Sequence, residues 1–428
     1  MSYRIAGIDV HKKLLAVVVS DVELEGEFQI ERRWFGASPD CLRMLAEWLI
    51  QQEVREVVME STAQYWKPVW QALEQYWKSN CQKLECGRPK SGALHLAQAF
   101  SNRGRRGRKR DFRDAERLVK RLRAHELTLS FVPDPEQRLW RTVTRRKYQL
   151  KLDRARLQNR LEALLEEAHI KLSSIVSDLL GTSARRMLKA LAEGETKPAA
   201  LAALADQRLR ATQEQLCDAL GACARLNSVY RRLLKMTLEE LQLIERQIDQ
   251  LDEEMRVLLR GHADAVQRLA AAPGFGVDSA QQVIAEVGSN AASFPSDKDL
   301  SSWVGACPGK EESAGVNYSN RSPKDNRHMR RILNQCANAA VKHKGSFFES
   351  LYRRLVSRLG HNQAIGAVAH RLCRLIWLIL HKGVRYEERG PAVSERSRKR
   401  RTARMIRELR KLGYGVIPMP SPARATSA

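Results

Sequence analysis

Residues 230–258 carry a seam of apolar side chains that leaves few folds open to this part of the chain. The seam steps alternately by four and by three residues, through Tyr230, Leu234, Thr237, Leu241, Ile244, Ile248, Leu251, Met255 and Leu258. This spacing is typical of a coiled-coil helix rather than of a helix on a globular surface. A second heptad repeat, Val143, Leu150, Leu157 and Leu164 with Leu161 and Ala168 in the complementary positions, supplies a second long helix. The two repeats predict either an antiparallel hairpin within one chain or an arm between two copies.

Residues 1–125 show a different pattern, in which strand-like and helix-like segments alternate. Short apolar runs at 3–10, 14–20 and 56–60, and a partly alternating run at 28–35, predict strands. Residues 40–51 and 66–78 have apolar side chains at helical spacing. This order predicts a mixed α/β sheet with helices on its faces.

The rest of the chain is predicted to be helical. Within the coiled-coil region 126–260, residues of about 170–225 are Ala-rich, are interrupted by Gly181, Gly194 and Pro198, and predict a small helical insertion. Region 262–384 opens on a helix end, a Pro-Gly-Phe-Gly turn and a second helix, which is a helix-hairpin-helix pattern. The amides of Gly274 and Gly276 in that turn suit a phosphate, although a plain helical hairpin with a Gly-rich turn has the same sequence. Residues 385–428 form a basic tail.

The charge of the chain predicts a polyanionic partner. Its 74 lysines and arginines against 49 acidic residues give a formal net charge of +25, which favours nucleic acid or an anionic membrane surface. The longest strongly apolar stretch, 375–380, is too short to span a bilayer, and no apolar signal region follows the N-terminus. We therefore expect a cytoplasmic protein without a membrane partner. Eight cysteines without a C-x-x-C pair indicate free thiols.

Four acidic residues lie at positions in the predicted strands and helix from which their side chains could approach one another. Asp9 and Glu60 close two strand patterns, and Asp111 and Asp114 lie three residues apart at the start of a helix, hence on one face. Such groups can converge at one edge of a sheet and hold Mg²⁺, and two such ions can bridge a scissile phosphate. The cations just before the helix would then engage a nucleic-acid backbone; they are Arg105, Arg106, Arg108, Lys109 and Arg110.

Each of these acids also has a structural interpretation. Asp9 can cap a turn, Glu60 can pair with a lysine, and Asp111 and Asp114 can complement the positive end of their helix. Only the combination favours a metal site.

The combination resembles a known family. Asp9 in "GIDVHKK", Glu60 in "ESTAQYW", the segment "KRDFRDA" and the downstream "PGFGVDSAQQVIAEVG…FPSDKDLSSWVGACPGKEESAGVNYS" resemble the DEDD-type transposases of the insertion sequence 110 and 1111 type. The resemblance covers about residues 3–123 and 262–384. It implies an α/β plus all-α fold: an RNase H-like (RuvC-like) mixed sheet with helices, a long coiled-coil arm, and a helical C-terminal transposase domain with a helix-hairpin-helix.

The resemblance also implies roles for single residues. Asp9, Glu60, Asp111 and Asp114 match the metal-binding tetrad, with two Mg²⁺ ions per site, and Ser313 in "ESAGVNYS" matches the nucleophilic serine. This loop reads Ser-Ala-Gly where the family has Ser-Gly-Gly, and Ser319 and Ser322 of the same polar loop remain alternatives to Ser313. Nearby positive charge can stabilise an anionic nucleophile; it is supplied by Lys310, Arg321, Lys324, Arg327, His328, Arg330 and Arg331. These residues, apart from His328, are also predicted to hold DNA.

The predicted function is a DNA transposase or recombinase that works through a phosphoserine intermediate. The resemblance implies donor and target DNA as substrates, a structured non-coding guide RNA that bridges them, and a dimer or tetramer with a composite active site. One alternative is a metal-dependent, junction-resolving endonuclease that uses water as the nucleophile. The other is a nucleic-acid-binding protein without catalysis, in which the acids only cap helices.

Overall fold

The fold was analysed in a computed structural model of the chain. It describes residues 4–21, 30–60, 63–79, 92–99, 111–307, 322–323, 325–388 and 402–415, and the backbone alone of 311–313, 316–319 and 395–401. The chain divides into two compact units, Met1–Pro133 and Asp134–Ala428. The domain boundaries predicted at 125, 260 and 384 stay predictions.

The first unit contains a five-stranded mixed sheet in the order β3-β2-β1-β4-β5, which confirms the predicted mixed α/β architecture. Its strands are β1 (Arg4–Val10), β2 (Leu14–Asp21), β3 (Ile30–Gly36), β4 (Val54–Glu60) and β5 (Ala93–Ala97). β1, β2 and β3 form an antiparallel meander, whereas β4 runs parallel to β1 and β5 parallel to β4. As a result, β1 and β4 end at the same edge of the sheet.

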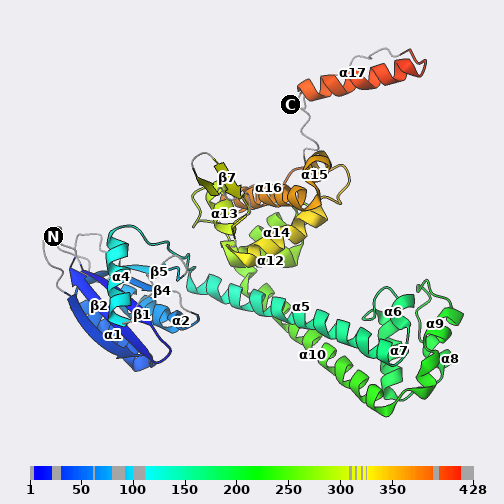
Figure 1. Ribbon diagram of the computed structural model, residues 1–428, viewed down its shortest axis with the longest axis horizontal. Helices are drawn as coiled ribbons and strands as arrows, with labels where there is room; N and C mark the ends of the chain where they lie inside the picture. Colours follow the sequence, from blue (N-terminus) through cyan, green and yellow to red (C-terminus); the bar gives the residue numbers. More distant parts are fainter. Residues whose placement is uncertain are drawn as a thin grey trace. The chain divides into compact units, whose positions relative to one another are not determined.

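Helices cover both faces of this sheet (Figure 1). α1 (Pro39–Gln51), α2 (Trp66–Ala72) and the π-helical segment Leu73–Lys78 share the larger core, which includes Ile8 and Met59. α4 (Asp111–Arg123) packs on the opposite face, against Ile5 and Val58. A Cβ atom at Gly7 would lie 2.3 Å from the carbonyl oxygen of Ala115, so α4 approaches β1 closely only because position 7 has no side chain.

Two long helices dominate the start of the second unit. α5 (Pro135–Glu167) and α10 (Ser228–Leu258) pack side by side along their length (Figure 1). Arg154 pairs with Glu245, and Lys147, earlier on α5, pairs with Asp252, later on α10, so the helices are antiparallel. The seam positions predicted on α10 are all buried or half-buried. Of the two predicted arrangements, the chain has the hairpin.

The far end of this hairpin carries the predicted helical insertion. It consists of α6 (Leu172–Ile175), α7 (Thr182–Glu193), α8 (Pro198–Ala202), α9 (Gln213–Ala219) and the 3₁₀ segment Gly221–Arg225. Their apolar side chains form one core with Leu157, Leu161 and Leu165 of α5 and with Leu234 and Leu241 of α10. The insertion is therefore an extension of the hairpin core.

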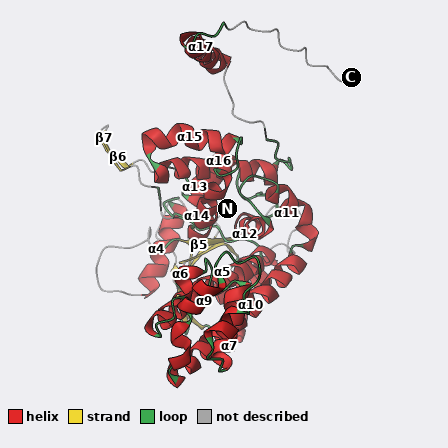
Figure 2. Ribbon diagram, turned by 90° about the vertical axis from the view of Figure 1, so that its right-hand side faces the viewer, coloured by secondary structure: helices red, strands yellow, loops and turns green. Residues whose placement is uncertain are grey.

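Helices also make up nearly all of the C-terminal part (Figure 2). The 3₁₀ segment Arg260–His262 leads into α11 (Ala263–Ala270), α12 (Val277–Val287) and α13 (Asp297–Val304). The β-hairpin of β6 (Glu311–Ser313) and β7 (Val316–Ser319) comes next, and then α14 (Arg327–Ala340), α15 (Phe347–Leu359), α16 (His361–His381) and α17 (Glu395–Lys411).

α16 is the central helix of this part, since it packs against α11, α13, α14 and α15. It is also the one described helix long and apolar enough to cross a membrane by length and composition. More than half of its apolar window, 56%, is buried inside the protein, as in a core helix.

Candidate metal centre and serine loop

Strand register brings Asp9 and Glu60 to neighbouring positions. Ile8 on β1 pairs with Met59 on β4, and Asp9 and Glu60 are the next residues on these two parallel strands. Ile8 and Met59 face the core under α1 and α2, and side chains alternate between the two faces of a strand. Asp9 and Glu60 therefore belong to the face that α4 covers.

The first turn of α4 adds two more carboxylates to this face. Asp111 begins the helix and Asp114 follows one turn later, in line with Ala115 and Leu118, which are buried against the sheet. The carboxylate of Asp114 accepts a 2.6 Å hydrogen bond from Arg117. The helix thus presents its acidic first turn to the end of β1.

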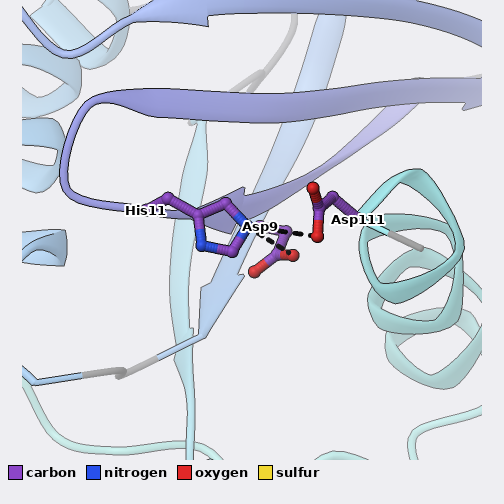
Figure 3. A group of neighbouring side chains, drawn as sticks. All are labelled: Asp9, His11 and Asp111. Carbon is purple, nitrogen blue, oxygen red and sulfur yellow. Dashed lines mark ion pairs between the residues drawn. The ribbon is translucent and has the colours of Figure 1, made fainter. Parts of the chain in front are cut away.

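Asp9, His11 and Asp111 form a compact cluster (Figure 3). The Nε2 atom of His11 lies 3.3 Å from Oδ2 of Asp9 and 3.3 Å from Oδ1 of Asp111. One potential ligand atom from each residue lies within 4.8 Å of the others. Asp9 is largely buried, while His11 and Asp111 are each about one-third exposed, so the cluster is accessible from solvent.

The donor set fits a divalent cation. Two carboxylates provide the hard oxygen ligands that Mg²⁺ prefers, and the imidazole nitrogen is a ligand for transition metals such as Zn²⁺. Sequence reasoning missed His11, although it stands two residues after Asp9 in "GIDVH". Glu60 and Asp114 lie outside this group of three, and their roles as ligands stay predictions, as do those of Asp9 and Asp111. The cations predicted at 105, 106 and 108–110 lie outside the described residues.

Ser313 is the last residue of β6 and pairs with Val316 at the closed end of the β6–β7 hairpin. The alternative Ser319 ends β7 and pairs with Glu311 at the open end. Ser322 follows the hairpin and is exposed. The two strand serines therefore sit at opposite ends of one short hairpin. Lys310, Arg321 and Lys324 lie outside the described residues.

The cations predicted on α14 differ in their surroundings. Arg327 is exposed, and Arg330 donates a hydrogen bond to the carbonyl of Pro323. Arg331 is half-buried, with its guanidinium 4.0 Å from the ring centroid of Tyr148 and hydrogen-bonded to Gln282. Burial lowers the pKa of Arg331. Arg331 therefore joins α14 to α5 and α12, and a contact of any of the three with DNA stays a prediction.

The glycine turn between α11 and α12 has a packing role. Gly274 has a φ of +82°, and a Cβ atom there would lie 2.1 Å from the carbonyl oxygen of Cys336 on α14. The amide of Gly276 donates to the hydroxyl of Ser279. The predicted helix, turn and helix are present, whereas phosphate binding by the two glycines stays a prediction.

A buried carboxylate ties the end of the serine loop to the long hairpin. Glu286 on α12 is 2% exposed and accepts hydrogen bonds of 2.9 Å from both Nε and Nη2 of Arg145 on α5. Its Oε2 also accepts from the side-chain amide of Asn326, which caps α14 directly after the serine loop. Burial raises the pKa of Glu286, but the bonds from Arg145 and the charge of Arg141 outweigh burial and hold the pKa below its usual range.

We expect Glu286→Ala to destabilise the full-length protein by about 3 kcal/mol, because it leaves the largely buried Arg141 and the partly exposed Arg145 without their carboxylate. Denaturant unfolding followed by circular dichroism measures this loss. Because the folded-state pKa of Glu286 is lowered, its contribution is complete above the unfolded pKa of about 4.3 and is lost as the pH falls through the folded-state pKa. Variant and wild type should therefore converge in acid. Glu253→Ala, which removes an exposed partner of Arg256, is the control, and an equal effect of both changes would contradict the prediction.

Two comparisons with known proteins now bear on this site. A family model described as "Transposase" matches residues 6–170, which include Asp9, His11, Glu60, Asp111 and Asp114. A second model, described as "Transposase IS116/IS110/IS902 family", matches residues 266–353, which include the serine loop and Glu286.

Curated relatives agree with these matches. The chain is 28% identical over 189 residues to a "Probable family 20 transposase" of Pseudomonas aeruginosa, which covers 43% of this chain and 55% of the relative. It is 27% identical over 173 residues to the "Transposase for insertion sequence element IS1111A" of Coxiella burnetii, covering 40% and 46%. The chain thus spans about half the length of these relatives.

The acidic cluster on the mixed sheet lies in one matched region and the serine loop in the other, so the chain is similar to transposases over two separate parts of its length. Over residues 266–353 the chain is similar to the IS116/IS110/IS902 family of transposases.

Proposed function

We propose that this protein is a DNA recombinase that excises and inserts a mobile element. The observation that carries the proposal is the cluster of Asp9, His11 and Asp111 at the ends of β1 and α4, inside the region that the transposase family matches. The sheet supports an RNase H-like assignment: it is an antiparallel three-stranded meander extended by parallel β4 and β5, with the acids at the end of β1 and on the covering helix.

The metal-binding residues in this proposal are Asp9, Glu60, Asp111 and Asp114. Two Mg²⁺ ions bound there would supply Lewis-acid stabilisation of the negative charge on a reacting phosphate. The first turn of α4 and the end of β1 hold the carboxylates in place, because the backbone of α4 packs directly against Gly7 of β1. His11 bridges Asp9 and Asp111 and would orient their carboxylates or add a ligand.

The nucleophile in this proposal is Ser313. Its Oγ forms a bond to a DNA phosphorus, one phosphodiester P–O bond breaks, and the displaced DNA oxygen takes up a proton. A hydroxyl of another DNA strand then attacks the phosphoserine, so the strand is rejoined and the serine is released. Ser313 ends β6 in the β6–β7 hairpin, and the bond from Asn326 to Glu286 anchors the chain that follows the serine loop.

Several partners follow from this function. Donor and target DNA are the substrates, and we infer a structured non-coding RNA, encoded by the element, that bridges them; the net charge of +25 suits both polymers. The resemblance to the transposase family implies a dimer or tetramer with a composite site, and we include this assembly in the proposal. An RNA of defined sequence that copurifies with the protein would support the RNA as a partner.

Strand exchange on DNA that carries the ends of the element tests the function. We expect rejoined products in Mg²⁺ and none after chelation by EDTA, with nucleic-acid binding retained in both conditions. Metal-dependent cleavage without rejoining would favour the junction-resolving endonuclease. Binding without cleavage in either condition would favour a nucleic-acid-binding protein without catalysis and would contradict the proposal.

A further inference from the structure

An aromatic pair made of an exposed tryptophan and a half-buried phenylalanine shares a helix turn with the acidic cluster. Trp34 on β3 and Phe112 on α4 lie with their ring centroids 4.7 Å apart and their planes tilted by 60°. Phe112 follows Asp111 in the first turn of α4, so the pair shares that turn with one residue of the candidate metal site. Trp34 nevertheless remains 46% exposed, although a large apolar ring gains most when it is buried.

Strand register places Trp34 on the same face of the sheet as the acids. Trp34 pairs with Ala16 on β2, and Ala16 pairs in turn with Asp9 on β1. Arg32, two residues before Trp34, reaches Glu116 on α4, which confirms that this side of β3 faces that helix. Asp9, Ala16 and Trp34 therefore form one row across three strands. Phe112, on the helix that covers this face, contacts Trp34 at the end of the row.

The surroundings of the pair are apolar and basic. Leu14, the first residue of β2 after the turn at 11–13, is 51% exposed. Lys12 and Lys13 in the same turn are exposed, as is Arg113 on α4. Proteins build sites for unpaired nucleotides from an exposed ring and nearby cations, since cations attract the backbone and rings stack on bases.

We propose that Trp34 and Phe112 form a platform on which an unpaired nucleobase stacks next to the acidic cluster. This inference rests on the proposed function, because it assumes that the stacked base belongs to the same nucleic acid that reacts at the acidic cluster. A base within an intact duplex is stacked on both faces and is not available to the indole. The platform therefore favours strands that are unpaired beside the reacting phosphate. Because every base has a flat aromatic face that can stack on the indole, this preference does not depend on the base sequence.

The experiment measures the affinity of the full-length protein in EDTA, so that no strand is cut. The probes are a short single-stranded DNA, the same sequence as a paired duplex, and the single strand with abasic sites. We expect Trp34→Ala to weaken binding of the single strand by roughly 5- to 150-fold, the range expected for loss of one stacked base. Binding of the duplex and of the abasic strand should change less than twofold.

Two variants serve as matched comparisons. Trp34→Phe keeps a ring and should retain most of the affinity for the single strand. Met44→Ala removes an equally exposed apolar side chain, 52% exposed, from α1 on the opposite face of the sheet, and should leave all three affinities unchanged.

A second measurement detects stacking of the base directly. 2-Aminopurine placed in the single strand loses fluorescence when it stacks on an aromatic ring, so binding of the wild-type protein should quench it. Quenching that persists in Trp34→Ala, or equal losses on single strand and duplex, would overturn the platform. Asp111→Asn separates the two proposals: if it cuts DNA at the wild-type rate while Trp34→Ala loses single-strand affinity, the metal assignment fails and the platform stands.

Discussion

Asp111→Asn is expected to bind DNA as the wild-type protein does and to cleave it at least a hundredfold more slowly. Asparagine preserves the size of the side chain and one oxygen, but it removes the negative charge that a divalent cation requires from its ligands. Asp111 is the first residue of α4, and its carboxylate lies 3.3 Å from the imidazole of His11, which also contacts Asp9. Single-turnover cleavage of end-labelled DNA in Mg²⁺, beside a binding titration in EDTA, measures both quantities.

Asp40→Asn is the matched control for this change. Asp40 also lies in the first turn of a helix of the same unit, but on α1, where its side chain is 88% exposed. We expect the control to cleave at the wild-type rate. If Asp111→Asn loses binding and cleavage together, Asp111 acts as a structural residue of α4 rather than as a metal ligand.

Ser313→Ala is expected to abolish a covalent link between protein and DNA. In the proposed reaction, the serine oxygen holds the phosphate between cutting and rejoining, so a suicide DNA substrate that cannot be rejoined should trap the adduct. The adduct migrates with the protein on a denaturing gel and maps by peptide mass to residues 310–321. Alanine removes only the hydroxyl, so binding of RNA and DNA should persist.

The other serines of the loop provide the comparison. Ser319→Ala and Ser322→Ala should still form the adduct at Ser313, because Ser319 lies at the other end of the hairpin from Ser313. An adduct that maps to either of them would keep the phosphoserine chemistry and correct only its position. Cleavage at the wild-type rate by Ser313→Ala, without any adduct, would favour attack by water and the endonuclease.

Regular side-chain patterns made the architecture predictable. The seam on α10 repeats over many residues, and each repeat adds to the signal, while β1 and β4 were predicted from short apolar runs. Asp9 and Glu60 close these apolar runs, and helical spacing put Asp111 and Asp114 on one face. β5 was not predicted, because the run "ALHLA" is only five residues long and is interrupted by His95.

Contacts between distant residues were beyond the reach of sequence reasoning. His11 gives no periodic signal, since it is a single residue in a turn, and only the folded chain brings it between Asp9 and Asp111. Glu286 and Arg145 are 141 positions apart, and neither stands in a pattern that identifies its partner. The choice between a hairpin and an arm also required the structure, because a heptad repeat specifies a partner helix without specifying which chain provides it.

The antiparallel course of α5 and α10 has a consequence for how this chain tolerates changes in length. The hairpin leaves from residue 135 and returns at residue 258, and the ring contact between Trp140 and His262, with centroids 5.2 Å apart, closes its base. Adding or removing matched heptads from both helices would therefore move the tip of residues 170–225 outward or inward while the base kept its geometry. The length of the hairpin therefore sets how far the tip extends from its base. A fluorescent label or a fused domain placed at the tip would report on its surroundings without displacing the helices that support the serine loop.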